Sequence, residues 1–534
     1  MLLILFNFEK ADEILAGLLP CPSCAKESDW DCLDFENFRS LDVQKWSTYK
    51  EIGELVQFLY DRFFKDRKAD IAKKHLKVIL LDLYVCWIEH PDQFLAVSLN
   101  NNDYHAKSRY NALHISKKTI QVVKTLYSVG LICLKGGFHD RDTRIGKLTR
   151  IRATEPLIEL FRLIRLELYH VRFPEDRELI ILSNTDVREL KVVKDGLEKT
   201  KISKRRNLVE YEDTKDTSRM REILKRYNGL LADTFIDIPS LEEAWGTGHQ
   251  RVCITHLNKY VHRTFNRSSF DYGGRFYGAW WMQCSKELRK QIFINDRPTS
   301  ELDYKGLHIV MLYALEGIEY WSLDRGDPYE IEVLQFQETG TARKDVKLLM
   351  LMLINASSVS NAYKAFRRAA EMGSHQKRYT NANLEQIYKL LKAKHPEIAH
   401  HFGSDIGITL MNLDAKITEI IIETFTEYSV PVLTVHDSYI VKWGWEKELE
   451  AMMHTAFSRV LGVSLDRRKE RGRAITYETE NKINFFEYFK LGCSDLIDEG
   501  YMDLECGILG KNKNYNFYKS NRYELNKRES ALSL

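Results

Sequence analysis

The pattern of apolar and polar positions predicts a β-hairpin over residues 430–441. Two runs rich in apolar and β-branched residues meet there at a polar corner made of His436, Asp437 and Ser438. Such runs build strands, whereas the corner places three hydrogen-bonding or charged side chains where a packed strand does not accept them. A bare surface turn more often uses Gly or Asn, so the corner indicates a site held on a rigid scaffold.

A second acid follows a second stretch of strand pattern. Residues 299–303 predict a strand and residues 306–315 a strongly apolar helix, so Asp303 falls at the corner between them. Two acids at strand ends can be neighbours in a sheet and hold two divalent ions about 3.5–4 Å apart for in-line phosphoryl transfer. Carboxylate oxygens suit Mg²⁺. We therefore expect Asp303 and Asp437 to bind two Mg²⁺ ions, with Mn²⁺ as the alternative metal.

Between these acids, residues 342–356 predict a helix with a distinct stripe. Arg343, Lys347, Leu351 and Asn355 recur every four residues and therefore share one face. Such a stripe would clamp a triphosphate and cover its base. A core helix with snorkelling cations is the alternative, and this segment taken alone favours it.

The N-terminal third predicts helices, then a helix followed by a basic hairpin. Ser116 caps a helical segment over residues 117–129, and residues 131–134 and 147–152 predict two strands. A capped helix with a basic hairpin resembles a winged helix, which reads the major groove and lays its wing along the backbone. A helical subdomain with a solvated basic face is the alternative. The residues expected to face nucleic acid are Lys117, Lys118 and Lys124 on the helix and Arg144, Lys147, Arg150 and Arg152 on the wing.

Composition sets broad limits. The chain has 534 residues, a formal net charge of +3 and 44% hydrophobic residues, which predicts a multidomain globular protein. No apolar run approaches the length of a membrane span, so we expect no membrane partner and a cytoplasmic location. Nine scattered cysteines favour free thiols. Cys21, Cys24 and Cys32 would supply three zinc ligands, but no fourth lies nearby.

These observations predict five regions. They are an unassigned segment (1–45), a winged-helix-like domain (46–170), a charged linker with exposed, thumb-like helices (171–245), a catalytic core (246–480) and a basic, aromatic segment (481–534).

Five segments carry a family resemblance. Asp303-Tyr304, Arg343-x3-Lys347 and Val435-His-Asp-Ser438 resemble, in order and spacing, the polymerase motifs of the family A group, which comprises DNA polymerase I-like enzymes and single-subunit RNA polymerases. Residues 271–278 resemble a segment of the single-subunit RNA polymerases that contacts template and primer, and residues 327–329 resemble the segment preceding the nucleotide-binding helix. The resemblance covers residues 261–463.

The resemblance implies an α+β multidomain fold with a right-hand palm, fingers and thumb behind the winged-helix-like domain. It implies a DNA template and primer and nucleoside triphosphates as partners. The implied catalytic residues are Asp303, Asp437 and His436, with His436 positioning the primer end. The implied nucleotide-binding residues are Arg343, Lys347, Leu351, Asn355, His308 and Tyr304, and the implied nucleic-acid contacts are Arg275 and Tyr277.

Four positions depart from the family pattern. Asn355 and Ala356 stand where these families usually have Tyr and Gly, and Leu351 replaces a Phe-like residue. His308 stands where the DNA polymerases usually carry a Glu that excludes the ribose hydroxyl.

We expect a DNA polymerase without proofreading, capable of priming, that replicates a mobile element, plasmid or phage with a helicase or small accessory protein. A single-subunit RNA polymerase or primase is one alternative, supported by the segment ending at Tyr277 and by His308. A non-catalytic, DNA-binding replication initiator is the other, supported by Asn355.

Overall fold

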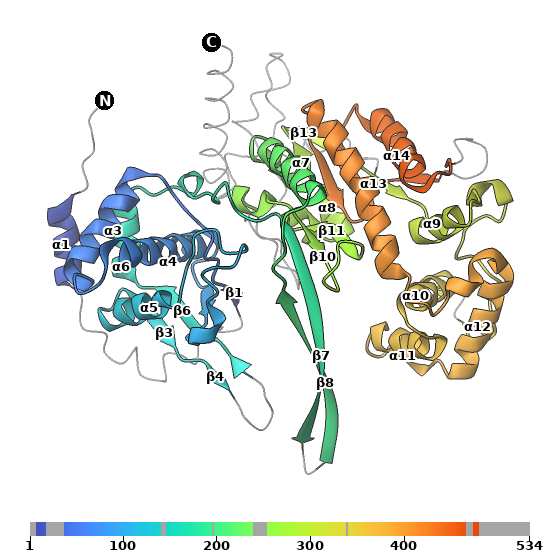
Figure 1. The fold of residues 1–534 in the computed structure, drawn as a ribbon, viewed down its shortest axis with the longest axis horizontal. Helices are drawn as coiled ribbons and strands as arrows, with labels where there is room; N and C mark the ends of the chain where they lie inside the picture. The colour runs from blue at the N-terminus through green and yellow to red at the C-terminus, as the bar shows by residue number, and fades with distance from the viewer. Residues whose placement is uncertain are drawn as a thin grey trace, which may run out of the picture.

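The computed structural model describes residues 7–17, 37–139, 146–194, 197–238, 254–337, 340–465 and 474–479. It is a mixed α/β protein whose buried side chains form three hydrophobic clusters (Figure 1). Within the described residues, no helix is both long enough and apolar enough to cross a membrane.

The N-terminal body packs helices against a four-stranded sheet of order β1-β2-β6-β3. The predicted helix and hairpin are present: Ser116 Oγ accepts a hydrogen bond from Lys118 N (3.3 Å), the helix follows, and two antiparallel strands come after it. The elements are α1 (Phe8–Ala16), α3 (Lys50–Phe63), α4 (Ala69–Glu89), α5 (Lys118–Ser128), α6 (Glu155–Leu163), β1 (Phe38–Ser40), β2 (Phe94–Val97), β3 (Ile132–Lys135), β4 (Phe138–His139), β5 (Gly146–Lys147) and β6 (Thr149–Ala153).

The region expected to be a charged linker contains a long antiparallel ribbon instead. Strands β7 (Ile180–Lys194) and β8 (Leu197–Leu208) pair without interruption from Ser183↔Leu208 to Lys194↔Leu197. The linker prediction over this segment is wrong because charged residues occupy both odd and even positions of the sequence there, which hides the period of two. The expected exposed helix exists as α7 (Lys215–Ala232), but one side of it is buried, and Tyr227 donates to Val432 O (2.6 Å).

A central sheet of order β14-β15-β13-β12-β9 holds both predicted acid-bearing strands. The expected hairpin is β14 (Val432–Val435) and β15 (Ser438–Lys442), and the expected strand 299–303 lies within β13 (Arg297–Tyr304). Because β13 and β15 are antiparallel neighbours, Asp303 lies opposite Ser438. The other strands are β9 (Ile236–Asp237), β12 (Phe293–Ile294) and β16 (Ile475–Thr479), which pairs with β13.

A second sheet of order β11-β10-β7-β8 connects the ribbon to the centre of the molecule. It contains β10 (His262–Phe265) and β11 (Gly273–Tyr277), and two short helices follow, η4 (Trp280–Gln283) and α8 (Lys286–Arg289). The ribbon and the strand that carries Arg275 therefore belong to one hydrogen-bonded sheet.

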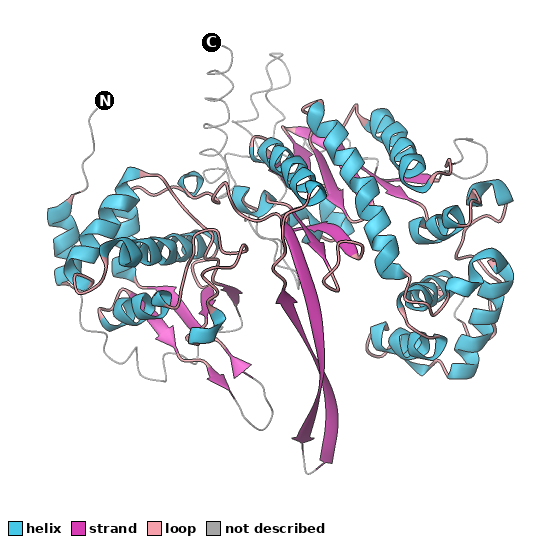
Figure 2. Ribbon diagram, viewed as in Figure 1, coloured by secondary structure: helices cyan, strands magenta, loops and turns pink. Residues whose placement is uncertain are grey.

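Helices pack beside the central sheet, and Figure 2 shows that the part farthest from the N-terminal body is helical. The predicted helices 306–315 and 342–356 are present as α9 and α10. The helices of this part are α9 (Leu307–Leu315), α10 (Ala342–Asn355), α11 (Val359–Ala369), α12 (Asn381–Lys394), α13 (Gly407–Glu427) and α14 (Glu446–Leu461). Asp345 of α10 is fully buried and accepts hydrogen bonds from Tyr379 Oη (2.5 Å) and Gln376 Nε2 (3.0 Å), which fixes the helix.

The corner between β13 and α9 depends on a glycine. Gly306 has φ +66°, and a Cβ added there would lie 2.7 Å from Pro328 Cγ. Gly317 has a similar φ of +73°, but a Cβ there meets nothing within 4 Å. Substitutions at these two positions therefore distinguish the cost of backbone strain alone from the added cost of a steric collision.

We expect Gly306→Ala to destabilise the protein by about 1–2 kcal/mol more than Gly317→Ala, because both substitutions strain the backbone and only the first displaces residues 327–329. Urea denaturation followed by fluorescence measures the difference. Equal losses of stability in the two variants would show that Pro328 can move away from the added methyl group without an energetic cost.

Candidate active site

Two carboxylates meet at the ends of neighbouring strands. Asp303 lies at the end of β13, and Asp437 lies in the turn between β14 and β15, next to the residue that pairs with Asp303. Burial raises the pKa of Asp303 to about 8, and the nearby charges of Asp437 and Glu301 add to the rise. The structure thus brings together the two acids that the sequence singled out.

Glu301 is an acid of this site that the sequence reasoning missed. It is buried on β13, ion-paired with Arg289 (2.8 Å), and it accepts a hydrogen bond from Ser438 Oγ (2.7 Å). Its bond to Ser438 ties β13 to β15 directly beside the two aspartates. The period of two in a strand places Glu301 on the same face as Asp303, and that was the available signal.

The residues at the tip of the hairpin are accessible. His436 is exposed with φ +57°, and its ring lies 6.3 Å, edge to face, from the ring of Tyr277 on β11. The expected catalytic His436 and the expected nucleic-acid contact Tyr277 therefore lie together beside Asp437.

Cations of α10 lie across from the carboxylates. Arg343, Lys347 and Leu351 are exposed, whereas the opposite face of α10 is buried, so the predicted stripe exists. The charge of Lys347 lowers the pKa of Asp303, against the larger effect of burial, which places this ammonium within electrostatic reach of the acids. Arg343 pairs with Asp327 (2.7 Å).

Tyr329 lies between the two groups. Its ring centre is 5.4 Å from the Arg343 guanidinium and 5.7 Å from Lys347 Nζ. Burial raises the pKa of its hydroxyl, and the charges of Asp437 and Asp327 raise it further. This tyrosine therefore lies within electrostatic reach of Asp437 and also contacts the two cations of α10 with its ring.

Asn355 turns away from this stripe. Its side-chain amide donates to Leu351 O (2.8 Å), and a Cβ at Gly407 would collide with Asn355 Oδ1. The side chain therefore packs between α10 and the start of α13, and only the first three residues of the stripe are exposed.

Arg275 lies near the charge of Asp437 and connects α13 to α9 through two hydrogen bonds. Its Nε donates to Asp414 Oδ2 (2.7 Å), and its Nη2 donates to His308 Nε2 (3.1 Å). Because arginine only donates, the His308 Nε2 accepts and the ring is neutral. Burial, with the Arg275 charge, lowers the pKa of His308 to about 4, which agrees with a neutral ring.

Asp414 is the second acid that the sequence reasoning missed. It lies fully buried on α13, and burial raises its pKa to about 7, although Arg275 opposes the rise. Its Oδ1 has no hydrogen-bond partner among the described residues. In the sequence Asp414 stands between Leu413 and Ala415, and an acid between apolar neighbours was the available signal for it.

Two of the expected contacts are not in accessible positions. Tyr304 is buried and its hydroxyl donates to Met453 O (2.6 Å), so the predicted nucleotide contact is wrong because the side chain belongs to the core. Arg150 is buried, its guanidinium lies 3.6 Å from the Phe38 ring centre, and it donates to Leu148 O (2.8 Å). The expected nucleic-acid contact of Arg150 is therefore also wrong.

The other basic residues of the N-terminal body are open to solvent to different degrees. Lys117 is exposed directly before α5, Lys118 and Lys124 are exposed on α5, and Lys147 is exposed on β5. Arg152 is one-quarter exposed and lies 3.4 Å from Asp92. Several expectations fall outside the described residues, namely Arg144, the three cysteines at 21, 24 and 32, and the segment 481–534.

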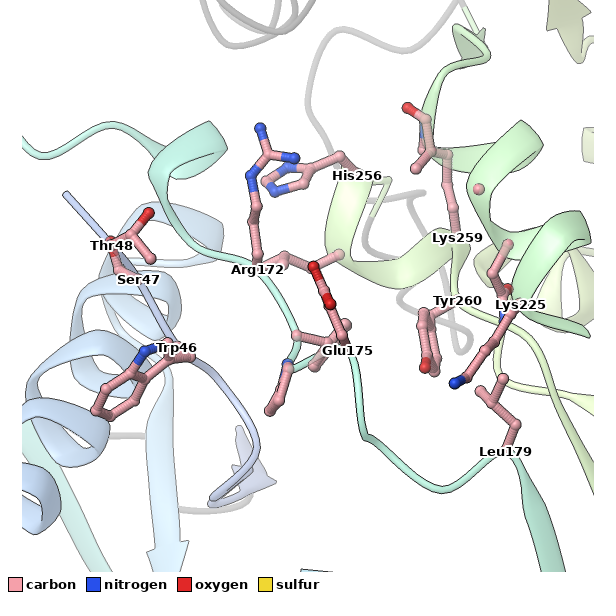
Figure 3. A pocket seen from close by; sticks show the side chains of 16 residues that line it. Trp46, Ser47, Thr48, Arg172, Glu175, Leu179, Lys225, His256, Lys259 and Tyr260 are labelled. Atoms are coloured by element: carbon pink, nitrogen blue, oxygen red, sulfur yellow. The ribbon is translucent and has the colours of Figure 1, made fainter. Parts of the chain in front are cut away.

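A cavity of about 740 Å³ lies apart from the carboxylates (Figure 3). Trp46 and Thr48 line it on one side, and Lys225 and Tyr260 on the other. Lys259 also lines it, donates to Thr234 O (2.6 Å), and has a pKa lowered by burial to about 8. The cavity joins the N-terminal body to the region around α7 and was not anticipated from the sequence.

Another group of potential metal ligands lies at the far end of α9. The ligand atoms of Glu316, His400 and His401 lie within 4.8 Å of one another. Both imidazoles approach the same Glu316 oxygen, at 3.2 and 3.0 Å. His401 Nε2 donates a hydrogen bond to this oxygen.

Comparisons with known proteins add a distant likeness to a solved structure. No protein-family model matches the chain, and no curated protein matches it. The chain is similar to a solved structure of the POL domain of Pol1 from M. smegmatis in complex with a DNA primer-template and dNTP, with 10% identity and a TM-score of 0.27. The match covers 80% of this chain and 65% of that one. A TM-score this low does not establish a common fold, so the geometry of the site carries the proposals below.

We expect Asp303→Asn to raise the free energy of unfolding by about 2 kcal/mol at pH 8 in the presence of EDTA. The pKa of Asp303 is raised in the folded state, so the folded protein binds more protons than the unfolded chain between about pH 4 and 8. Its stability contribution therefore falls as pH rises through this window, and the amide removes that loss.

Urea denaturation at pH 5 and pH 8 measures the effect, with the exposed Asp324→Asn as the matched control. An equal gain in the free energy of unfolding at both pH values would show that ionisation of Asp303 does not destabilise the folded protein.

Proposed function

We propose that this protein is a template-directed nucleotidyltransferase that extends DNA from a primer. One observation carries the proposal: Asp303 and Asp437 lie side by side at strand ends, opposite the exposed cations Arg343 and Lys347. Phosphoryl transfer to a nucleotide chain needs metal-binding carboxylates and a cationic clamp for the triphosphate more than it needs a covalent nucleophile. The observed groups match these two needs.

The donor set fits Mg²⁺. Carboxylate oxygens are the ligands that Mg²⁺ prefers, and the raised pKa of Asp303 reflects repulsion and burial that a bound cation would relieve. Asp303 and Asp437 would hold the metal. When bound, Mg²⁺ would stabilise the negative charge that develops on the transferring phosphoryl group.

The protein's own residues would position the substrates. Arg343 and Lys347 would neutralise the triphosphate, and Arg343 would exchange its ion pair with Asp327 for a phosphate oxygen. Tyr329 would keep both cations oriented through its ring. His436 and Tyr277, at the exposed tip, would contact the end of the primer strand.

The exposed lysines of α5 would bind template DNA. Lys117 is the N-cap residue of a helix that carries Lys118 and Lys124 and is followed by a two-stranded hairpin, which is the order of elements expected of a winged helix. Their charges would neutralise phosphates rather than read bases. The helicase or accessory protein expected from the sequence stays a prediction.

A single-subunit RNA polymerase or primase is the second candidate, and the state of His308 favours it. The neutral ring accepts a hydrogen bond from Arg275 and carries no negative charge at the position where the resembling DNA polymerases exclude a ribose hydroxyl. Incorporation of ribonucleotides without a primer would support this candidate over the first.

We expect Asp303→Asn and Asp437→Asn each to lower primer extension about 10³-fold or more, because each removes a metal-binding charge. The assay uses labelled primer-template, Mg²⁺ and all eight nucleotides, with Asp324→Asn as the control. No extension by the unmodified chain with any nucleotide, or full activity in either site variant, would refute the proposal.

We expect Arg343→Ala and Lys347→Ala each to raise the KM for the incoming nucleotide about 10- to 100-fold, the value of one charge-assisted contact. Lys344→Ala removes an exposed charge from the neighbouring position on the same helix and should change KM less than about twofold. An equal effect of all three substitutions would indicate general electrostatic attraction instead of a clamp.

A further inference from the structure

Two histidines and a glutamate converge where the end of α9 meets the short helix η7 (Pro396–His401). Glu316 directly follows α9, and His400 and His401 are the last two residues of η7. Their ligand atoms lie within 4.8 Å of one another. Nε2 of His400 lies 3.2 Å, and Nε2 of His401 3.0 Å, from the same oxygen of Glu316. The three side chains therefore surround one point.

Hydrogen bonding explains only part of this convergence. His401 donates a hydrogen bond to Glu316, whereas His400 reaches the same oxygen without one and pairs with it as an ion only when its ring is protonated. Successive residues of a 3₁₀-helix lie about 120° apart around its axis, so adjacent side chains normally point in different directions. The ring centres of His400 and His401 nevertheless lie 4.0 Å apart. A shared cation would explain why a neutral His400 lies here.

The donor atoms match Zn²⁺. Zinc takes imidazole nitrogen and carboxylate oxygen together, whereas Mg²⁺ prefers oxygen ligands alone. With Zn–N and Zn–O distances of about 2.0–2.2 Å, two ligand atoms of a tetrahedral site lie about 3.3–3.5 Å apart. The two separations measured from the Glu316 oxygen, 3.2 and 3.0 Å, are only slightly shorter. The group therefore differs in chemistry from the all-carboxylate pair Asp303 and Asp437.

The elements that carry the three ligands are fixed to each other. Tyr313 of α9 lies with its hydroxyl 3.0 Å from His395 Nδ1 and 3.1 Å from Glu397 Oε2, about one helical turn before the ligands on each element. A site held on rigid elements requires little rearrangement to bind an ion. The His400 side chain is 58% exposed, so an ion can enter from solvent.

We propose that Glu316, His400 and His401 bind one Zn²⁺ ion, which joins the end of α9 to η7. Three protein ligands leave the fourth tetrahedral position to water. The ion would stabilise the folded protein, because the unfolded chain does not hold the three ligands together. The nine residues of α9 separate this site from the strand end with Asp303 by about 13 Å along the helix, so the inference does not rest on the proposed function.

Two single substitutions in the untagged, full-length chain test the proposal. His400→Ala removes one nitrogen ligand. Glu316→Gln removes the metal-binding charge but keeps an oxygen that accepts the hydrogen bond from His401, so it distinguishes metal binding from hydrogen bonding. The matched controls are His105→Ala and Glu371→Gln, which change an exposed histidine and an exposed glutamate elsewhere. Equilibrium dialysis against Zn²⁺ followed by elemental analysis measures the bound zinc.

We expect each site variant to bind one zinc ion per chain fewer than the unmodified protein, or to bind that ion about tenfold or more weakly. Both controls should bind as much as the unmodified protein. Because the result is a difference between variants, zinc bound elsewhere, for example by cysteines, does not affect it. Equal zinc binding by the site variants and the controls would overturn the proposal.

Thermal unfolding tests whether the ion joins the two elements. Zn²⁺ should raise the unfolding midpoint of the unmodified protein and of both controls, and the rise should grow with zinc concentration. The rise should be smaller in Glu316→Gln and His400→Ala. An equal rise in all variants would refute the stabilising role of this site. Circular dichroism without zinc confirms that the variants fold.

Discussion

The repulsion between Asp303 and Asp437 is the constraint on which the centre of this molecule depends. Two partly buried carboxylates side by side oppose folding. Burial raises the pKa of Asp303, and the charges of Asp437 and Glu301 raise it further. The register of β13 against β15 imposes it, and the hydrogen bond between Ser438 and Glu301 fixes the register beside the acids. A rigid scaffold can hold such charges together, and the proposed divalent cation would give them a chemical use.

Two neighbouring helices place charged groups near this pair. Lys347 of α10 is exposed within electrostatic reach of Asp303, and Arg343 lies one turn before it, because buried Asp345 fixes the opposite face of the helix. Asp414 of α13 accepts a hydrogen bond from Arg275, which also donates to a neutral His308 and lies near the charge of Asp437. In the proposed function, positive charge is thus available where a triphosphate would lie.

Outside the centre, the N-terminal body presents exposed lysines on a support of its own. Lys118 and Lys124 of α5 belong to a body with its own hydrophobic core. A nucleic-acid ligand of the proposed site would meet these charges at points far from Asp303 in the sequence. Lysines that contact a phosphate backbone supply affinity and position without reading sequence.

The sequence by itself determined the elements that carry the acids and the stripe of cations. Local periods of two and of nearly four residues predicted the hairpin with Asp437, the strand with Asp303 and the helix with Arg343, because these patterns depend on neighbours in the chain. Tertiary structure alone decided that Glu301 and Asp414 join the site, that Tyr304 and Arg150 are buried, and that a supposed linker is a paired ribbon. Each of these outcomes depends on a partner distant in the sequence, and no local period encodes the identity of that partner.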